Sequence, residues 1–161
     1  MFFKLTISKC VIIAAALTLP TGLVSANVNT SSLQLKTSIQ EVNGVREIEA
    51  GDYTRGIAKT KANLSKVTVT SLRAPLLNNL CVAYIALQDF QNAKQACDES
   101  VATGQNSDIA LNNRAVFHYA TGNVQASLDD LLAIKRSRQH KGLIASNLDI
   151  VRQNVLISQN N

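Results

Sequence analysis

The sequence predicts an all-α fold, specifically a right-handed α-solenoid of about three helical hairpins followed by a C-terminal capping helix. Two observations predict it. A motif recurs at a spacing of about 34 residues, and each copy contains stretches with apolar residues every three or four positions, the period of an amphipathic helix. The chain has 161 residues, of which 46% are hydrophobic, so it is long enough for one domain and too apolar for a disordered chain.

The repeat is clearest in two short segments. Asn-Leu-Cys-Val-Ala-Tyr at 79–84 aligns with Asn-Arg-Ala-Val-Phe-His at 113–118, and Asn147 follows Asn113 at the same spacing. The helical repeat domain is therefore expected to span residues 38–158, with a polar tail at 159–161.

Each unit is expected to be a helical hairpin. Small residues lie twelve positions apart on either side of each turn, and two antiparallel helices approach closely only where side chains are small. The three pairs are Gly44 with Gly56, Cys81 with Ala93, and Ala115 with Ser127. Pro75 is expected in the first turn of its helix, where its missing N–H costs nothing.

The final helix, residues 141–157, is expected to close the array. Its apolar stripe consists of Ile144, Leu148, Val151 and Val155. Asp149 stands where the earlier units carry a small residue, because no further helix approaches there. A polar outer face suits the end of a solenoid.

Residues 1–26 have the pattern of a cleaved signal peptide. Two lysines precede an apolar run that is too short to span a membrane, and Val24-Ser25-Ala26 supplies the small residues of a cleavage site. Cleavage after Ala26 removes both lysines and leaves a chain from Asn27 to Asn161 with a net charge of +3 instead of +5. The protein is therefore expected to be periplasmic, with an extracellular location as the alternative. Residues 27–37 are expected to be a flexible spacer.

The repeat resembles the tetratricopeptide repeat (TPR) family, in the form of an exported TPR protein. That family has hairpins of about 34 residues with a small residue, an aromatic residue and then Gly-Asp-Tyr at the turn. The matching turns are Gly51-Asp52-Tyr53, Gln88-Asp89-Phe90 and Gly122-Asn123-Val124, with Tyr84 and His118 at the aromatic position. No Trp begins the helices and no Pro closes the units, so another helical solenoid, such as Sel1-like repeats, is the alternative.

The resemblance implies a peptide-binding groove. In similar TPR proteins, asparagines on the first helix of each hairpin hold the main chain of an extended peptide, since a side-chain amide offers both a donor and an acceptor. The candidate residues are Asn78, Asn79, Asn112, Asn113 and Asn147, with Val82, Val116 and Tyr119 expected to line an apolar floor about one turn further on. The alternative is that these asparagines are ordinary polar residues on an exposed helix face.

Cys81 and Cys97 are the two cysteines that remain after the leader is removed. They lie at equal distances from Asp89, the centre of the turn, and so at equal heights on two antiparallel helices. In an oxidising compartment such a pair can form a disulfide. The alternative is two buried thiols that pack as small apolar residues.

The motifs favour a non-enzymatic scaffold that binds a peptide or protein segment. The two histidines, His118 and His140, lie in no catalytic or metal-binding pattern, and neither a cofactor nor a metal is expected. The basic cluster at 135–141 is interpreted as a solvated loop, with contact to membrane headgroups or an acidic partner as the alternative. Nucleic acid is not expected as a partner. Alternative functions are a structural subunit of an envelope assembly and an accessory factor to an envelope enzyme.

Overall fold

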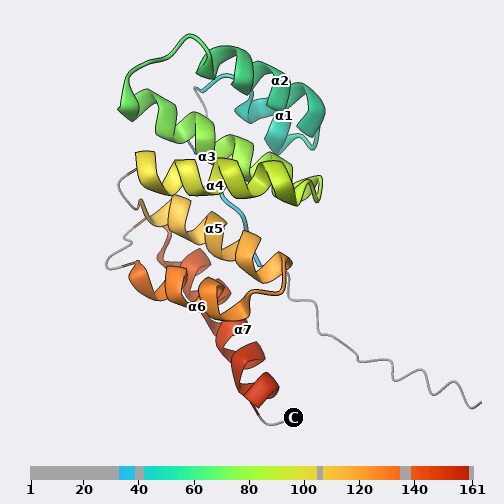
Figure 1. The fold of residues 1–161 in the computed structure, drawn as a ribbon, viewed down its shortest axis with the longest axis vertical. Helices are drawn as coiled ribbons and strands as arrows, with labels where there is room; N and C mark the ends of the chain where they lie inside the picture. Colours follow the sequence, from blue (N-terminus) through green and yellow to red (C-terminus); the bar gives the residue numbers. More distant parts are fainter. Residues whose placement is uncertain (1–32, 39–41, 105–106, 135–138, 160–161) are drawn as a thin grey trace, which may run out of the picture. The chain divides into compact units, whose positions relative to one another are not determined.

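The computed structural model describes residues 33–38, 42–104, 107–134 and 139–159. Within these residues the chain forms helices and no strand, which confirms the predicted all-α class (Figure 1). The helices of the described ranges are α1 (Val45–Glu49), α2 (Tyr53–Leu64), α3 (Thr70–Ala86), α4 (Phe90–Thr103), α5 (Asp108–Ala120), α6 (Val124–Ala133) and α7 (Lys141–Gln159). Every described residue belongs to one compact unit, which spans Ser31–Asn161.

Several sequence predictions concern residues outside the described ranges. These are the signal peptide at 1–26, the first part of the spacer at 27–32, most of the basic cluster at 135–138 and the end of the polar tail at 160–161.

The three predicted turns share one geometry. In each, a residue with positive φ precedes an Asp or Asn whose side chain accepts a hydrogen bond from the backbone N–H three residues later. Glycine adopts this φ without steric cost at two of the turns, and Gln88 adopts it at the third with φ of 58°. The Asp or Asn caps the helix that follows, so these tripeptides begin α2, α4 and α6.

Consecutive helices pack against one another from α1 to α7, and α3 also contacts α1 and α5. The contact between Gly44 and Gly56 shows why small residues are needed there. A Cβ atom added to Gly56 would lie 2.5 Å from Ile48 Cγ1 and 3.1 Å from the carbonyl oxygen of Gly44. The other residues of the predicted close approaches, Cys81, Ala93, Ala115 and Ser127, are each at most 1% exposed.

The substitution Gly44→Ala is expected to lower the free energy of unfolding by about 2 kcal/mol or more. Gly44 has φ of +96°, which strains any other residue, and the added Cβ would lie 2.6 Å from the carbonyl oxygen of Gly56. Urea denaturation measures the change. Gly142→Ala in α7 is the matched control, because open space surrounds its Cβ, and it should leave stability unchanged or raise it by up to about 1 kcal/mol. Equal stability of Gly44→Ala and the wild type would contradict the close packing of α1 on α2.

The prediction for Pro75 is wrong. α3 begins at Thr70, so Pro75 is the sixth residue of the helix and lies inside it. It cannot donate a hydrogen bond to the carbonyl of Ser71, but Ser71 is exposed, so water can serve that carbonyl. The apolar period begins at Leu76, and the preceding turn of α3 is largely exposed, so periodicity could not reveal it.

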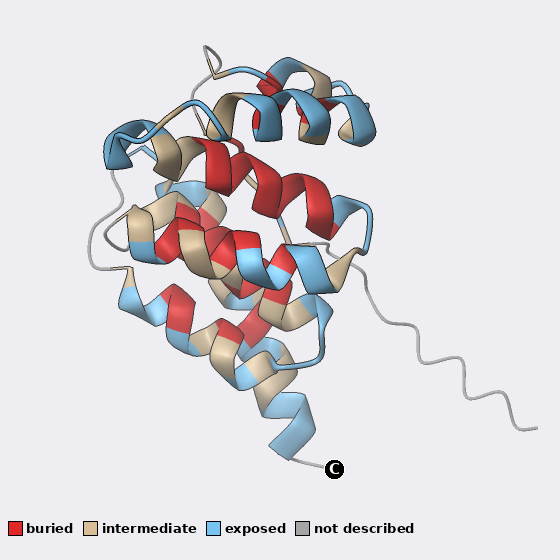
Figure 2. Cartoon of the chain, turned by 45° about the horizontal axis from the view of Figure 1, so that its top comes forward, coloured by how far each residue is buried: buried red, intermediate tan, exposed pale blue. Residues whose placement is uncertain are grey.

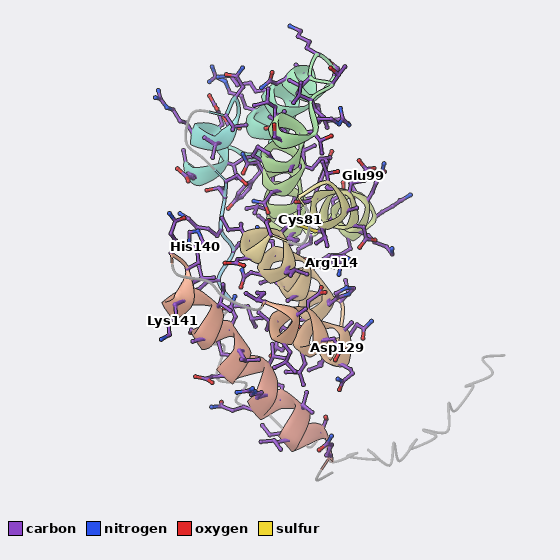
Figure 3. All side chains as sticks on the ribbon, turned by 90° about the vertical axis from the view of Figure 1, so that its left-hand side faces the viewer. Cys81, Glu99, Arg114, Asp129, His140 and Lys141 are labelled. Carbon is purple, nitrogen blue, oxygen red and sulfur yellow. A yellow bond between two sulfur atoms is a disulfide. The ribbon has the colours of Figure 1, made fainter. Side chains whose placement is uncertain are left out.

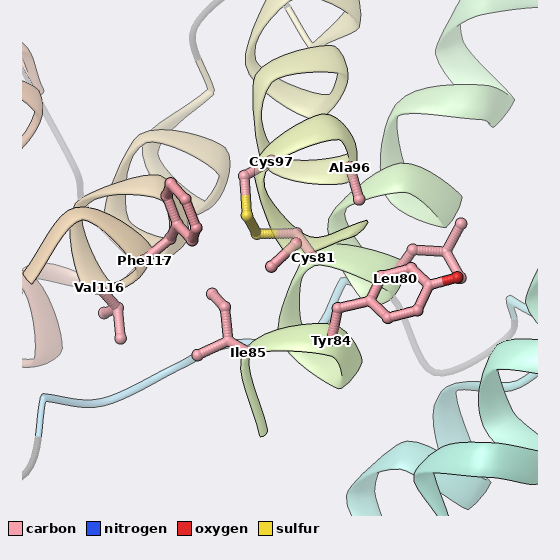
Figure 4. Close-up of a cluster of buried hydrophobic side chains, with 9 residues drawn as sticks. Leu80, Cys81, Tyr84, Ile85, Ala96, Cys97, Val116 and Phe117 are labelled. Atoms are coloured by element: carbon pink, nitrogen blue, oxygen red, sulfur yellow. A yellow bond between two sulfur atoms is a disulfide. The ribbon is translucent and has the colours of Figure 1, made fainter. Parts of the chain in front are cut away.

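Cys81 on α3 and Cys97 on α4 lie in a core cluster between α3, α4 and α5 (Figure 4). Their sulfur atoms are 2.04 Å apart and their Cα atoms 4.8 Å apart, so the pair is at disulfide bonding distance. This is one of the two alternatives that the sequence leaves open. Figure 2 shows that buried residues run along most of α3, the helix that carries Cys81.

α7 has the apolar stripe that the sequence predicts. Ile144 and Val151 are buried, Leu148 and Val155 are half-buried, and Asp149 is exposed on another face. The stripe packs α7 against α6. Among the described helices, α7 included, none has the length and apolar character needed to cross a membrane.

Candidate peptide-binding groove

Residues 33–38, which we call the segment, form an extended stretch that meets the helices carrying the predicted asparagines. Figure 3 shows it in pale blue, passing α3 and α5 toward α7. The segment is the part of the predicted spacer that the structure describes, together with Ser38. Its main chain is held by hydrogen bonds to side chains that are 41 to 113 positions away in the sequence.

Two asparagines each bind both main-chain groups of one residue of the segment. Asn147 on α7 accepts a hydrogen bond from the Gln34 N–H (2.8 Å) and donates one to the Gln34 carbonyl (2.9 Å). Asn113 on α5 binds Lys36 in the same way, at 3.0 and 2.7 Å. One amide can serve both groups because it carries a donor and an acceptor side by side.

Asn79 on α3 continues the series with a single hydrogen bond. Its Oδ1 accepts the N–H of Ser38 at 2.7 Å, whereas its Nδ2 has no partner among the described residues. Each later asparagine of the series also donates to an asparagine on the preceding helix of the series, but α1 contains no asparagine. The series therefore ends at α3.

A second row of asparagines supports the first. Asn112 and Asn78 donate to the same two segment carbonyls, at 3.0 and 3.1 Å. The rows are also joined, because Asn147 Nδ2 donates to Asn112 Oδ1 (2.8 Å) and Asn113 Nδ2 donates to Asn78 Oδ1 (2.9 Å). These side-chain bonds couple the orientations of the two amides in each pair. We call the two rows together the ladder.

All five asparagines of the ladder are buried, with 3% exposure or less. They are therefore not ordinary polar residues on an exposed face. A buried primary amide needs hydrogen-bond partners, and here the main chain of the segment and the neighbouring asparagines supply them, except at Asn79 Nδ2. The structure thus brings the predicted asparagines together around one extended stretch of chain.

The apolar side chains of the segment lie against the residues predicted to form a floor. Leu33 and Leu35 both pack against the cluster that contains Val116, and Leu35 also packs against the cluster that contains Val82. Leu33 reaches a further cluster, against which the half-buried Tyr119 also packs. The segment therefore joins three apolar clusters.

The composition around the segment predicts a flexible spacer, although the alternation of residues within the segment is typical of an extended strand. Leu33, Leu35 and Thr37 alternate with polar residues, which is the period of an extended strand with one buried face. Thr37 is 8% exposed, and its hydroxyl donates to Glu49. The surrounding Ser, Thr and Asn residues favour a loop. The alternation extends over only a few residues, and it does not indicate which helices the segment contacts.

An open hollow of about 920 Å³ lies beside the segment. Its walls include Lys36, Thr37 and Ser38, the N-terminal half of α3, the first turn of α5, and the end of α4. Many of the lining side chains are hydroxyls, among them Thr70, Ser71, Thr103 and Ser107. The groove therefore continues past the segment.

A charged cluster joins α4, α5 and α6. Arg114 donates to both carboxylate oxygens of Asp130, from Nε at 2.8 Å and from Nη2 at 2.6 Å, and its Nη1 lies 3.5 Å from Asp98. The hydrogen bonds to Asp130 raise the pKa of Arg114. His118 Nε2 lies 3.7 Å from Asp130, but burial of the ring outweighs this carboxylate and lowers the pKa of His118. The cluster stabilises the packing of the three helices.

Acidification is expected to destabilise the fold through His118. Because its pKa in the folded chain lies below the ordinary value of 6.5, the unfolded chain binds the proton more readily. The contribution to stability is complete above that ordinary value and is lost as the pH falls through the lowered pKa. Urea midpoints at about pH 7.5 and about pH 5 should differ more for the wild type than for His118→Phe, which keeps an aromatic ring. An equal difference in both proteins would contradict the role of His118.

Within the described residues, no group of three or more His, Cys, Asp or Glu side chains is placed to hold a metal ion. His140 borders the hollow beside the segment. In the part of the basic cluster that the structure describes, Gln139 and Lys141 are exposed.

Comparison with protein-family models, curated proteins and solved structures finds no match for this chain.

Proposed function

We propose that this protein is a non-enzymatic interaction module that binds an extended peptide or protein segment along the ladder. We further propose that its helices form a right-handed α-solenoid of the TPR type, capped by α7. The observation that carries the proposal is the paired hydrogen bonding of the Gln34 and Lys36 main chains by Asn147 and Asn113. Hydrogen bonds to the main chain suit any extended segment, because every residue except proline offers the same two groups.

The segment acts as a tethered competitor for this groove. A short tether gives it an effective concentration in the millimolar range, so a weak partner does not displace it. A partner that succeeds needs contacts beyond those that the segment makes. The adjoining hollow of about 920 Å³ provides room for such contacts.

An exported, periplasmic location belongs to the same proposal, with an extracellular location as the alternative. The leader-like pattern of residues 1–26 supports export. The Cys81–Cys97 pair, at bonding distance, is compatible with an oxidising compartment. The partner is then a protein or peptide of that compartment.

Peptide capture by the full chain tests the proposal. Lys36→Pro removes the N–H that Asn113 accepts, so this variant should expose the groove. It should enrich peptides from a random library, while the wild type enriches far fewer. The double variant Lys36→Pro/Asn113→Ala, which damages the ladder itself, should enrich none. If Lys36→Pro keeps its helical circular dichroism spectrum and captures no peptide, the proposal is wrong.

A structural subunit of an envelope assembly is the second candidate. Leu132 on α6 and Leu156 and Ile157 on α7 are each more than half exposed, as apolar residues of contact surfaces often are. This candidate gains support if Leu156→Ser/Ile157→Ser prevents co-sedimentation with envelope complexes and Lys36→Pro captures no peptide.

A further inference from the structure

We propose that the groove selects its partner by direction and by an alternating side-chain pattern, both of which the segment displays. The partner is an extended peptide whose N-terminal end lies on α7 and whose C-terminal end lies on α3. It carries aliphatic side chains at two alternate positions and threonine at the next alternate position, and it has no proline directly after any of these three residues. This inference rests on the proposed function.

The direction follows from the order in which the segment meets the helices. Gln34 binds the asparagine of α7, Lys36 that of α5 and Ser38 that of α3. Each helix of this set takes every second residue, a step of about 6.6 Å along an extended chain. The chain thus runs from N to C opposite to the order of the helices.

A reversed peptide cannot make the same hydrogen bonds unless the amides turn over. Reversal exchanges the places of N–H and C=O along the groove, so each asparagine would have to exchange its Oδ1 and Nδ2. The bonds between the asparagines could form again if both amides of a pair turned over together. The two carbonyl positions could not adapt in this way, because each carbonyl accepts two donors, Asn147 and Asn112 at Gln34 and Asn113 and Asn78 at Lys36. An N–H in the same place has a single hydrogen, so one buried amide oxygen would lose its partner, which is costly.

The side-chain pattern follows from burial along the segment. Leu33 and Leu35 pack against apolar clusters, so these two positions favour aliphatic residues. Thr37 is buried and donates to Glu49, so this position favours a small side chain with a hydroxyl.

The residues that follow these three positions are selected through their main chain and not through their side chains. Gln34 is exposed and Lys36 and Ser38 are half-buried, so their side chains matter less. Their N–H groups are each bound by the ladder, which excludes proline at all three.

The ligand of this groove is a separate partner peptide and not a second copy of this chain. The segment is already seated in its own groove, so a second copy offers the same contacts without the advantage of a tether. A separate partner can also use the hollow that the segment leaves open.

The test uses the full chain with Lys36→Pro and a fluorescent peptide with the sequence of residues 32–39, Ser-Leu-Gln-Leu-Lys-Thr-Ser-Ile. Fluorescence anisotropy should show binding to the variant and at least about tenfold weaker binding to the wild type, whose segment competes. Three control peptides should each bind at least about tenfold more weakly than the parent. They are the reversed sequence, the peptide with both leucines replaced by serine, and the peptide with proline in place of the lysine.

Each outcome decides the inference. Equal binding of the reversed or serine-containing peptide would overturn it, even if library capture upholds the proposed function. If Lys36→Pro loses its helical spectrum, Leu33→Ser/Leu35→Ser in the full chain opens the same groove by removing the apolar contacts, and the same peptides are compared on it. If the wild type forms dimers that Lys36→Pro abolishes, the occupant is a second copy, and the inference of a separate partner is wrong.

Discussion

Replacing Lys36 with proline is expected to detach the segment from the ladder and to lower the free energy of unfolding by about 2–3 kcal/mol. Proline lacks the N–H that Asn113 accepts at 3.0 Å, and its ring needs space at a buried contact. A buried acceptor that loses its donor costs about 1–3 kcal/mol, and the lost burial of Leu35 adds to that cost. Urea denaturation measures the change in stability.

Lys36→Ala is the matched control, because it keeps both main-chain groups and should change stability by no more than about 0.5 kcal/mol. Amide hydrogen exchange provides a second measurement, of which N–H groups of the segment are hydrogen-bonded. The N–H groups of residues 34, 36 and 38 should be protected in the wild type, whereas those of residues 33, 35 and 37 make no hydrogen bond within the described part and should exchange faster. If Lys36→Ala destabilises the chain as much as the proline variant, the lysine side chain, and not the main chain, holds the segment.

Loss of the Cys81–Cys97 bond is expected to lower the free energy of unfolding by about 3 kcal/mol. The two residues are 16 positions apart, and closing a loop of that size restricts the unfolded chain by about this amount. Both cysteines are at most 1% exposed, so a reductant should act only when the α3–α4 hairpin opens. Urea midpoints with and without reductant measure the effect.

The double variant Cys81→Ala/Cys97→Ala should match the reduced wild type and should not respond to reductant. Mass spectrometry after alkylation provides an independent test. Two alkylated thiols in the native protein would show that the cysteines pack as thiols.

Local signals made the helices predictable. Asp89 and Asn123 cap helices with the hydrogen bond that their side chains favour in any protein, so the turns can be located from the sequence alone. Gly44 and Gly56 reveal a helix contact because only small residues allow it. Pro75 was misleading, since an exposed first turn of α3 leaves no apolar period to detect.

The asparagines of the site could be predicted from the sequence, whereas the segment that they bind could not. The recurrence of Asn79, Asn113 and Asn147 at one regular spacing places equivalent side chains on successive hairpins, and the structure brings these three together. The segment that these asparagines bind could not be predicted, because they bind its main chain, and main-chain hydrogen bonds do not require particular side chains at positions 34 and 36. The burial of the asparagines followed from that segment and could not be predicted without it.

The hydrogen bonds between Gln34 and Asn147 link residues that are 113 positions apart in the sequence. This separation determines the order in which parts of the chain fold. The segment leaves the ribosome before any of its partners, whereas Asn147 lies in the last helix. Closing so long a loop is slow compared with forming the helical hairpins, which need only neighbouring residues. The segment therefore docks last, and α3, α5 and α7 must already be aligned when it does so. Until that step, Leu33 and Leu35 stay exposed, and a chain caught before it would present both an empty groove and a free strand to fill another.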